Sequence, residues 1–174
     1  ATFSILGDWV KNIAKDKAEI IILVGADADT HTFEPTPQDI ITLAKADIIF
    51  ENGLGFEHWL TDIYKASGSQ AVRIDISSAM ELNYIDEKNV DPHVWQNVKN
   101  AIKAVEKICE ELKKSDPENA LFYESNAKQY ILQLEQLDLW IVETISIVPI
   151  ESRKIVTSHD SFGYFAKKYG LKIV

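Results

Sequence analysis

The sequence predicts an α/β fold in which a mostly parallel sheet flanked by helices forms a first, N-terminal lobe. A long linker helix and the beginning of a second α/β lobe follow. Three observations lead to this prediction. Short apolar runs typical of buried strands alternate with amphipathic segments, one much longer helical pattern interrupts the alternation, and a strand, helix and strand return after it. We therefore expect a first lobe over residues 1–114, a linker helix over 115–149 and the start of a second lobe over 150–174.

The strands are predicted from apolar runs bounded by turn residues. Alternation of such runs with helices is typical of parallel sheets covered on both faces. The chain begins as though a strand were under way and ends on an unpartnered strand, so we expect further residues before Ala1 and after Val174. The expected strands are Thr2–Leu6, Ile20–Val24, Ile48–Glu51, Val72–Ile76 and Lys154–Thr157.

Helices are expected between the strands, over Pro37–Lys45, Phe56–Ala66 and Val94–Lys114. The first of them has a clear start signal, because Thr36 can cap the helix and Pro37 suits its first position. A short helix is also expected after the turn at Gly7.

The long helix is predicted to begin at Ser115, which forms a capping-box pattern with Glu118, and to end at Pro149. A helix of this length reaches about 45–50 Å and should connect two lobes. Its apolar positions are Ala127, Tyr130, Ile131, Leu134, Leu137, Ile141, Ile145 and Val148.

Composition excludes one broad class of function. The formal net charge is −9 and the sequence pI is about 4.9, so the basic surface of a nucleic-acid-binding protein is absent and a cation is the more natural charged partner. Cys109 is the single cysteine and lies in a helical pattern, where we interpret it as a packing residue.

Three of the four histidines share a topological position. His31, His93 and His159 each follow a predicted strand or its loop and precede a helix. Connections that leave the carboxyl ends of parallel strands meet at one edge of the sheet, so these side chains can converge there. Neutral imidazoles are good ligands for zinc and related ions, and three of them leave room for a carboxylate or water. His58 lacks this placement and is interpreted as a surface residue of a helix.

Topology alone leaves open whether these histidines form a site or are unrelated surface and core residues.

Other motifs give weaker evidence for a functional site. Gly53 and Gly55 lack the third glycine of a dinucleotide fingerprint. Ser158, His159 and Asp160 are consecutive, so they cannot adopt the geometry of a hydrolytic triad.

Four segments resemble a known family in order and spacing: "DTHTFEPTPQDI", "ADIIFENGLGFEHWL", "DPHVWQNVKNA" and "TSHDSFGYFAKKYGL". They are similar to the metal-binding solute-binding proteins of bacterial ABC transporters, the zinc and manganese receptors related to pneumococcal surface adhesin. The resemblance extends over essentially the whole chain. It implies two α/β lobes joined by a rigid helix, with the metal between them. It further implies that His31, His93 and His159 are ligands, together with an acidic residue of the second lobe beyond Val174.

The resemblance also implies what the protein does. We expect a monomeric receptor, not an enzyme, which is periplasmic or lipid-anchored outside the cytoplasmic membrane and delivers a divalent ion to an ABC permease. Histidine at position 159, where some members have glutamate, favours Zn²⁺ over Mn²⁺. The segment before His93 is short and has no further histidine, which weakens the zinc assignment. A manganese- or iron-specific receptor, a metal-dependent hydrolase and a cell-surface adhesin are the alternatives.

Overall fold

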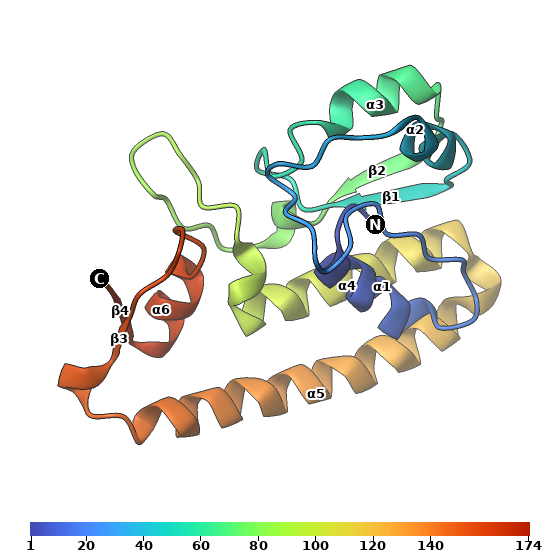
Figure 1. Cartoon of the computed structure of the whole chain (residues 1–174). Coiled ribbons are helices and arrows are strands. Elements are labelled where there is room, and N and C mark those ends of the chain that lie inside the picture. The colour runs from blue at the N-terminus through green and yellow to red at the C-terminus, as the bar shows by residue number, and fades with distance from the viewer.

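The computed structural model describes all residues from Ala1 to Val174. Figure 1 shows a larger part, formed by about the first two thirds of the chain, and a small part at the far end of one long helix that runs beneath both. The elements of the larger part are α1 (Ser4–Ala14), α2 (Pro37–Ala44), β1 (Ile48–Glu51), α3 (Leu60–Ser67), β2 (Val72–Asp75) and α4 (Val98–Ser115), with 3-10 turns at Ile76–Ala79 and Val94–Gln96. The long helix is α5 (Ala120–Ser146), and the small part contains β3 (Lys154–Ile155), α6 (Gly163–Tyr169) and β4 (Lys172–Ile173).

The strands are parallel, as predicted. β1 pairs with β2 in a register that sets Ile48 opposite Val72. β3 pairs with β4, so the expectation that the last strand is unpartnered was wrong. Two extended segments continue the first sheet beyond β1. The Thr2 N–H donates to the Phe50 carbonyl at 3.1 Å, and the Val24 N–H donates to the Thr2 carbonyl at 2.9 Å. The α/β class with a parallel sheet flanked by helices is therefore confirmed.

Several predicted strands were too long. The prediction of a strand over Thr2–Leu6 was wrong after Phe3, because α1 begins at Ser4 and buries Leu6 and Trp9 on one face of a helix. The turn predicted at Gly7 was wrong for the same reason, since Gly7 lies inside α1. Of the run Ile20–Val24, only Val24 forms a bridge, with Phe3. The strand predicted over Val72–Ile76 ends at Asp75, whose side chain accepts the Ser77 N–H and starts a 3-10 turn. The strand predicted over Lys154–Thr157 ends at Ile155.

The helix starts show which local signals were sufficient. The cap at Thr36 is confirmed, since its hydroxyl accepts the Asp39 N–H and the Asp39 carboxylate accepts the Thr36 N–H, with Pro37 at the first position. The helix predicted from Phe56 begins only at Leu60, because tight turns precede it. The helix predicted from Val94 is split into a 3-10 turn and α4, which Asn97 caps by accepting the Lys99 N–H.

The long helix begins later than predicted. Ser115 is the last residue of α4, so the capping box with Glu118 does not form; a 3-10 turn at Pro117–Asn119 separates the two helices. α5 has 27 residues, ends at Ser146 and not at Pro149 as predicted, and is about 40 Å long, shorter than the predicted 45–50 Å. Most of its predicted apolar positions pack against the core, whereas Leu137 and Val148 are exposed.

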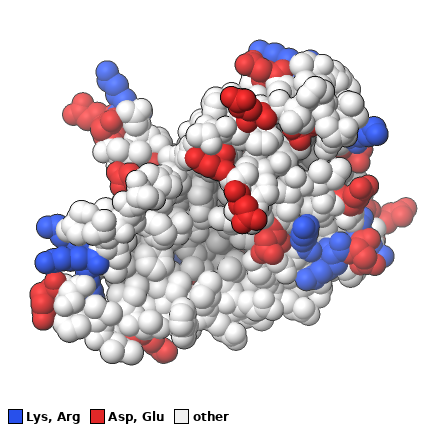
Figure 2. Space-filling model, viewed as in Figure 1, with Lys and Arg blue, Asp and Glu red and all other residues white.

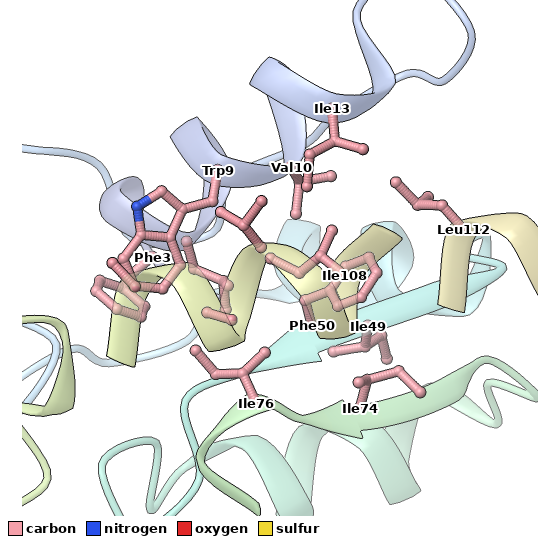
Figure 3. Close-up of a cluster of buried hydrophobic side chains, with 14 of the residues drawn as sticks. Phe3, Trp9, Val10, Ile13, Ile49, Phe50, Ile74, Ile76, Ile108 and Leu112 are labelled. Atoms are coloured by element: carbon pink, nitrogen blue, oxygen red, sulfur yellow. The ribbon is translucent and has the colours of Figure 1, made fainter. Parts of the chain in front are cut away.

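The core lies between the sheet and the helices α1, α4 and α5. Figure 3 shows Val10 and Ile13 of α1, Ile49 and Phe50 of β1, and Ile108 of α4 in this core. Cys109 is buried beside them, in the packing role that the sequence indicated. None of the helices combines the length and the apolar character needed to cross a membrane.

Candidate metal centre

Three histidines from distant segments meet at one point. His31 lies in the loop between Val24 and α2, His93 lies just before the 3-10 turn that leads to α4, and His159 lies in the loop between β3 and α6. One ligand atom from each lies within 4.8 Å of the other two, and the two Nε2 atoms of His31 and His93 are 3.4 Å apart. Two nitrogens bound to one tetrahedral zinc ion are about 3.3 Å apart, given Zn–N bonds of about 2.0–2.1 Å. The cluster is therefore compact enough to hold one ion.

Solvent reaches this cluster from one side. His31 and His159 are exposed, whereas His93 is only 6% exposed. The three rings line a cavity of about 260 Å³ together with Phe56 and Trp95. Figure 2 shows a hollow in the middle of the molecule with acidic side chains above it and to its right. An ion can thus enter from solvent and reach a buried imidazole.

His93 is oriented by the carboxylate of Asp91. Asp91 Oδ1 accepts the backbone N–H of His93 at 2.9 Å and lies 2.7 Å from its Nδ1. Both residues are buried. This contact favours the tautomer with the proton on Nδ1, which leaves Nε2 free to bind an ion.

His31 is held by its own loop and by an aromatic neighbour. Its backbone N–H donates to Asp29 Oδ1 at 2.9 Å, and the preceding carbonyl of Thr30 accepts the Trp59 indole N–H at 3.2 Å. The ring packs edge to face on Phe56, with 4.9 Å between centroids. Although His31 is open to solvent on one side, its packed neighbours partly desolvate the ring, and this desolvation, followed by the proximity of His93, lowers the pKa of His31. Its neutral, ligand-competent form is favoured as a result.

A buried polar network lies next to the segment that carries His93. The Asn52 side-chain amide donates to the Pro92 carbonyl at 2.9 Å, next to His93. The Glu57 carboxylate accepts the backbone N–H groups of Asn52 and Gly53 and the Thr2 hydroxyl. Burial raises the pKa of Glu57 although these three donors oppose the shift. The network ties the end of β1 to the turn that carries His93.

The histidine cluster has the members that the sequence indicated. His31, His93 and His159 converge as expected from their topology, and their role as metal ligands remains a prediction. His58 lies outside the cluster and is exposed, just before α3. Sequence reasoning gave no role to Asp91. An acidic residue two positions before a candidate ligand could have indicated it, because the unused nitrogen of a metal-binding histidine usually donates to a carboxylate or carbonyl.

The sequence profile of a family described as "Zinc-uptake complex component A periplasmic" (ZnuA) matches residues 1–174. The chain belongs to this family. It is 35% identical over 174 residues to the manganese-binding lipoprotein MntA of Halalkalibacterium halodurans, a match that covers 99% of this chain and 58% of that protein. It is also 35% identical over 181 residues to the manganese ABC transporter substrate-binding lipoprotein PsaA of Streptococcus mitis, covering 98% of this chain and 59% of PsaA.

Comparison with solved structures leads to the same family. The periplasmic zinc binding protein TroA from Treponema pallidum superposes with a TM-score of 0.94 at 30% identity, covering 99% of this chain and 64% of TroA. A crystal structure of ZnuA superposes with a TM-score of 0.91 at 29% identity, covering 99% of this chain and 68% of that one. The chain thus spans about 58–59% of the length of these curated relatives. The family assignment confirms the predicted class, the extracytoplasmic solute-binding proteins.

Proposed function

We propose that the chain is the metal-binding part of a receptor that captures a divalent transition-metal ion outside the cytoplasm and delivers it to an ABC permease. The observation that carries the proposal is the meeting of three imidazole nitrogens within 4.8 Å at a solvent-accessible cavity. The relatives support it, since two of them are named as manganese-binding or manganese transporter lipoproteins and TroA as a zinc-binding protein.

In this proposal His31, His93 and His159 each donate one nitrogen to the ion. The fourth position is open to water or to a carboxylate from the further length that the relatives have. Residues 1–114 form the metal-binding lobe, 115–149 connect it, and 150–174 begin a second lobe that contributes His159. The receptor acts as a monomer. Binding requires the ion to lose water and the imidazoles to be neutral, and no covalent step is needed.

Zinc is the cargo that the donor set favours. Three imidazole nitrogens suit zinc better than manganese, which prefers carboxylate and carbonyl oxygens. Two relatives that are 35% identical to this chain are named as manganese proteins, which favours manganese instead. A manganese- or iron-specific receptor is therefore the alternative within the same class.

The test is a competition titration of zinc and manganese against a chromophoric chelator. We expect the wild type to bind one ion, with zinc preferred. His93→Ala should lose more affinity than the roughly 10- to 100-fold typical of a change outside the ligand shell. The matched control is His58→Ala, which removes an exposed imidazole outside the cluster and should leave affinity unchanged. Equal zinc affinity in wild type and His93→Ala would refute the proposal.

A further inference from the structure

Tyr164 joins the two parts of the molecule beside the histidine cluster. It is the second residue of α6, only 2% exposed, and follows His159 closely in the chain. Its hydroxyl donates to the Asp91 carbonyl at 3.0 Å and accepts the Asn83 N–H at 2.9 Å. One hydroxyl therefore bonds to both ends of the loop that leads into His93, which the Asp91 N–H also joins by donating to the Asn83 carbonyl at 2.9 Å.

The Asp91 carboxylate has a different neighbour at each of its two oxygens. Its Oδ1 holds His93. Its other carboxylate oxygen faces Gly163, where an added Cβ would lie only 2.7 Å from Oδ2. The start of α6 thus packs directly against the residue that orients His93. A side chain at position 163 would displace that carboxylate.

We infer that Tyr164 is a positioning residue for metal binding, which fixes His93 and His159 relative to each other through Asp91 and α6. This inference rests on the proposed function. His93 and His159 belong to segments that are far apart in the chain, so their separation is not set by local structure. The hydroxyl fixes it before the ion arrives, which lowers the ordering cost of binding.

The coupling acts in both directions, because linkage between two equilibria is reciprocal. If the hydrogen bonds of Tyr164 with Asp91 and Asn83 hold the ligands in place, a bound ion in turn stabilises these hydrogen bonds. Bound zinc should therefore slow hydrogen exchange at the Asn83 amide, whose acceptor is the Tyr164 hydroxyl. Asn83 is not itself one of the candidate ligands.

The experiment compares Tyr164→Phe with Tyr169→Phe by zinc competition titration. The control is well matched: Tyr169 lies on the same helix, is 6% exposed, and donates its hydroxyl to Asp138 Oδ1 of α5 at 2.6 Å. Loss of the Tyr164 hydrogen bonds should weaken zinc binding about 2- to 10-fold. Tyr169→Phe should leave zinc affinity unchanged. Gly163→Ala should weaken binding in the same direction by displacing the Asp91 carboxylate.

The outcomes separate this inference from the proposed function. A wild type that does not bind zinc refutes the proposed function itself. If the wild type binds zinc but Tyr164→Phe has the same affinity as Tyr169→Phe, the positioning role is wrong. Exchange at the Asn83 amide that is equal with and without zinc in the wild type also overturns it, and this measurement needs no variant.

Discussion

Asp91 Oδ1 lies 2.7 Å from His93 Nδ1, and both side chains are buried. The same oxygen accepts the His93 backbone N–H, so one carboxylate fixes both the backbone and the ring of the residue. The negative charge makes the imidazole a stronger donor to a cation, and the hydrogen bond prevents the ring from rotating. The most buried member of the cluster is therefore also the best oriented one.

Asp91→Asn should accordingly weaken zinc binding by about 10- to 100-fold, because the amide keeps the shape but loses the charge. Competition titration measures the change. Asp116→Asn is the control: this carboxylate accepts the Tyr123 hydroxyl between α4 and α5 and makes no contact with the histidines. A full retention of zinc affinity in Asp91→Asn would show that the carboxylate does not support a ligand.

Thr2→Val tests the buried polar network around Glu57. The Thr2 hydroxyl donates to the buried carboxylate of Glu57 at 2.7 Å, and this bond opposes the rise in the pKa of Glu57 that burial causes. We expect the free energy of unfolding to fall by about 1–3 kcal/mol at neutral pH, since a buried acceptor loses a donor. The loss is fully present while Glu57 is ionised and shrinks as the pH falls through its pKa.

Thermal unfolding at neutral and acidic pH measures this difference. Thr61→Val is the control, because Thr61 is an exposed β-branched residue that only receives a long contact of 3.4 Å from Arg73. A Thr2→Val protein as stable as the control at neutral pH would mean that the hydroxyl does not stabilise the Glu57 carboxylate.

The parts of the fold that the sequence predicted well have local signals. β1 was predicted to the residue as an apolar run, and the start of α2 was predicted from Thr36 and Pro37, which act within one turn. The errors arose where tertiary context decides. The Ser115 and Glu118 pattern is locally a capping box, yet Ser115 is still inside α4. The apolar residues after Phe3 fit a strand equally well, but their burial follows a helical face.

The candidate site also has residues that the sequence predicted and residues that it did not. The three histidines were predictable because parallel topology gathers the ends of strands at one edge, whatever the side-chain packing. The role of Asp91 depends on ring geometry, and that of Tyr164 depends on α6 meeting a loop far away in sequence. Periodicity and spacing carry no information on such a meeting.

Acidic side chains near the histidines should speed the capture of a cation. The loop and helix start over residues 25–39 contain Asp27, Asp29, Glu34 and Asp39 and no lysine or arginine. Figure 2 shows acidic side chains above the hollow and to its right. The double variant Asp27→Asn and Glu34→Gln should lower the zinc association rate about 2- to 5-fold at low salt, with little change near physiological salt. Stopped-flow measurements at several ionic strengths test this.

The control for the stopped-flow experiment removes the same charge elsewhere, by Asp62→Asn on α3 and Glu106→Gln on α4. If both double variants slow association equally, the effect comes from net charge alone. Rates that do not depend on ionic strength would exclude steering by the acidic segment.

Metal affinity should depend steeply on pH. Each imidazole must be neutral to bind an ion, and a free histidine has a pKa near 6.5. Partial burial lowers the pKa of His31, so this ligand stays neutral to lower pH than a free histidine does. Proton competition at the cluster should still reduce zinc affinity markedly between about pH 7 and about pH 5. Competition titrations at these two pH values measure the slope.

His159→Glu should soften that slope and change the preferred ion. A carboxylate with a reference pKa near 4.3 remains ionised where imidazole becomes protonated, so one of the three competing protonations is removed. An oxygen donor in place of nitrogen also favours manganese relative to zinc. The zinc-to-manganese affinity ratio should therefore fall in the variant, whereas Gln129→Glu, which adds a carboxylate at an exposed position of α5 outside the cluster, should change neither quantity. If His159→Glu leaves both the pH slope and the ratio unchanged, His159 is not a ligand, and the ion is held by His31 and His93 with donors from elsewhere.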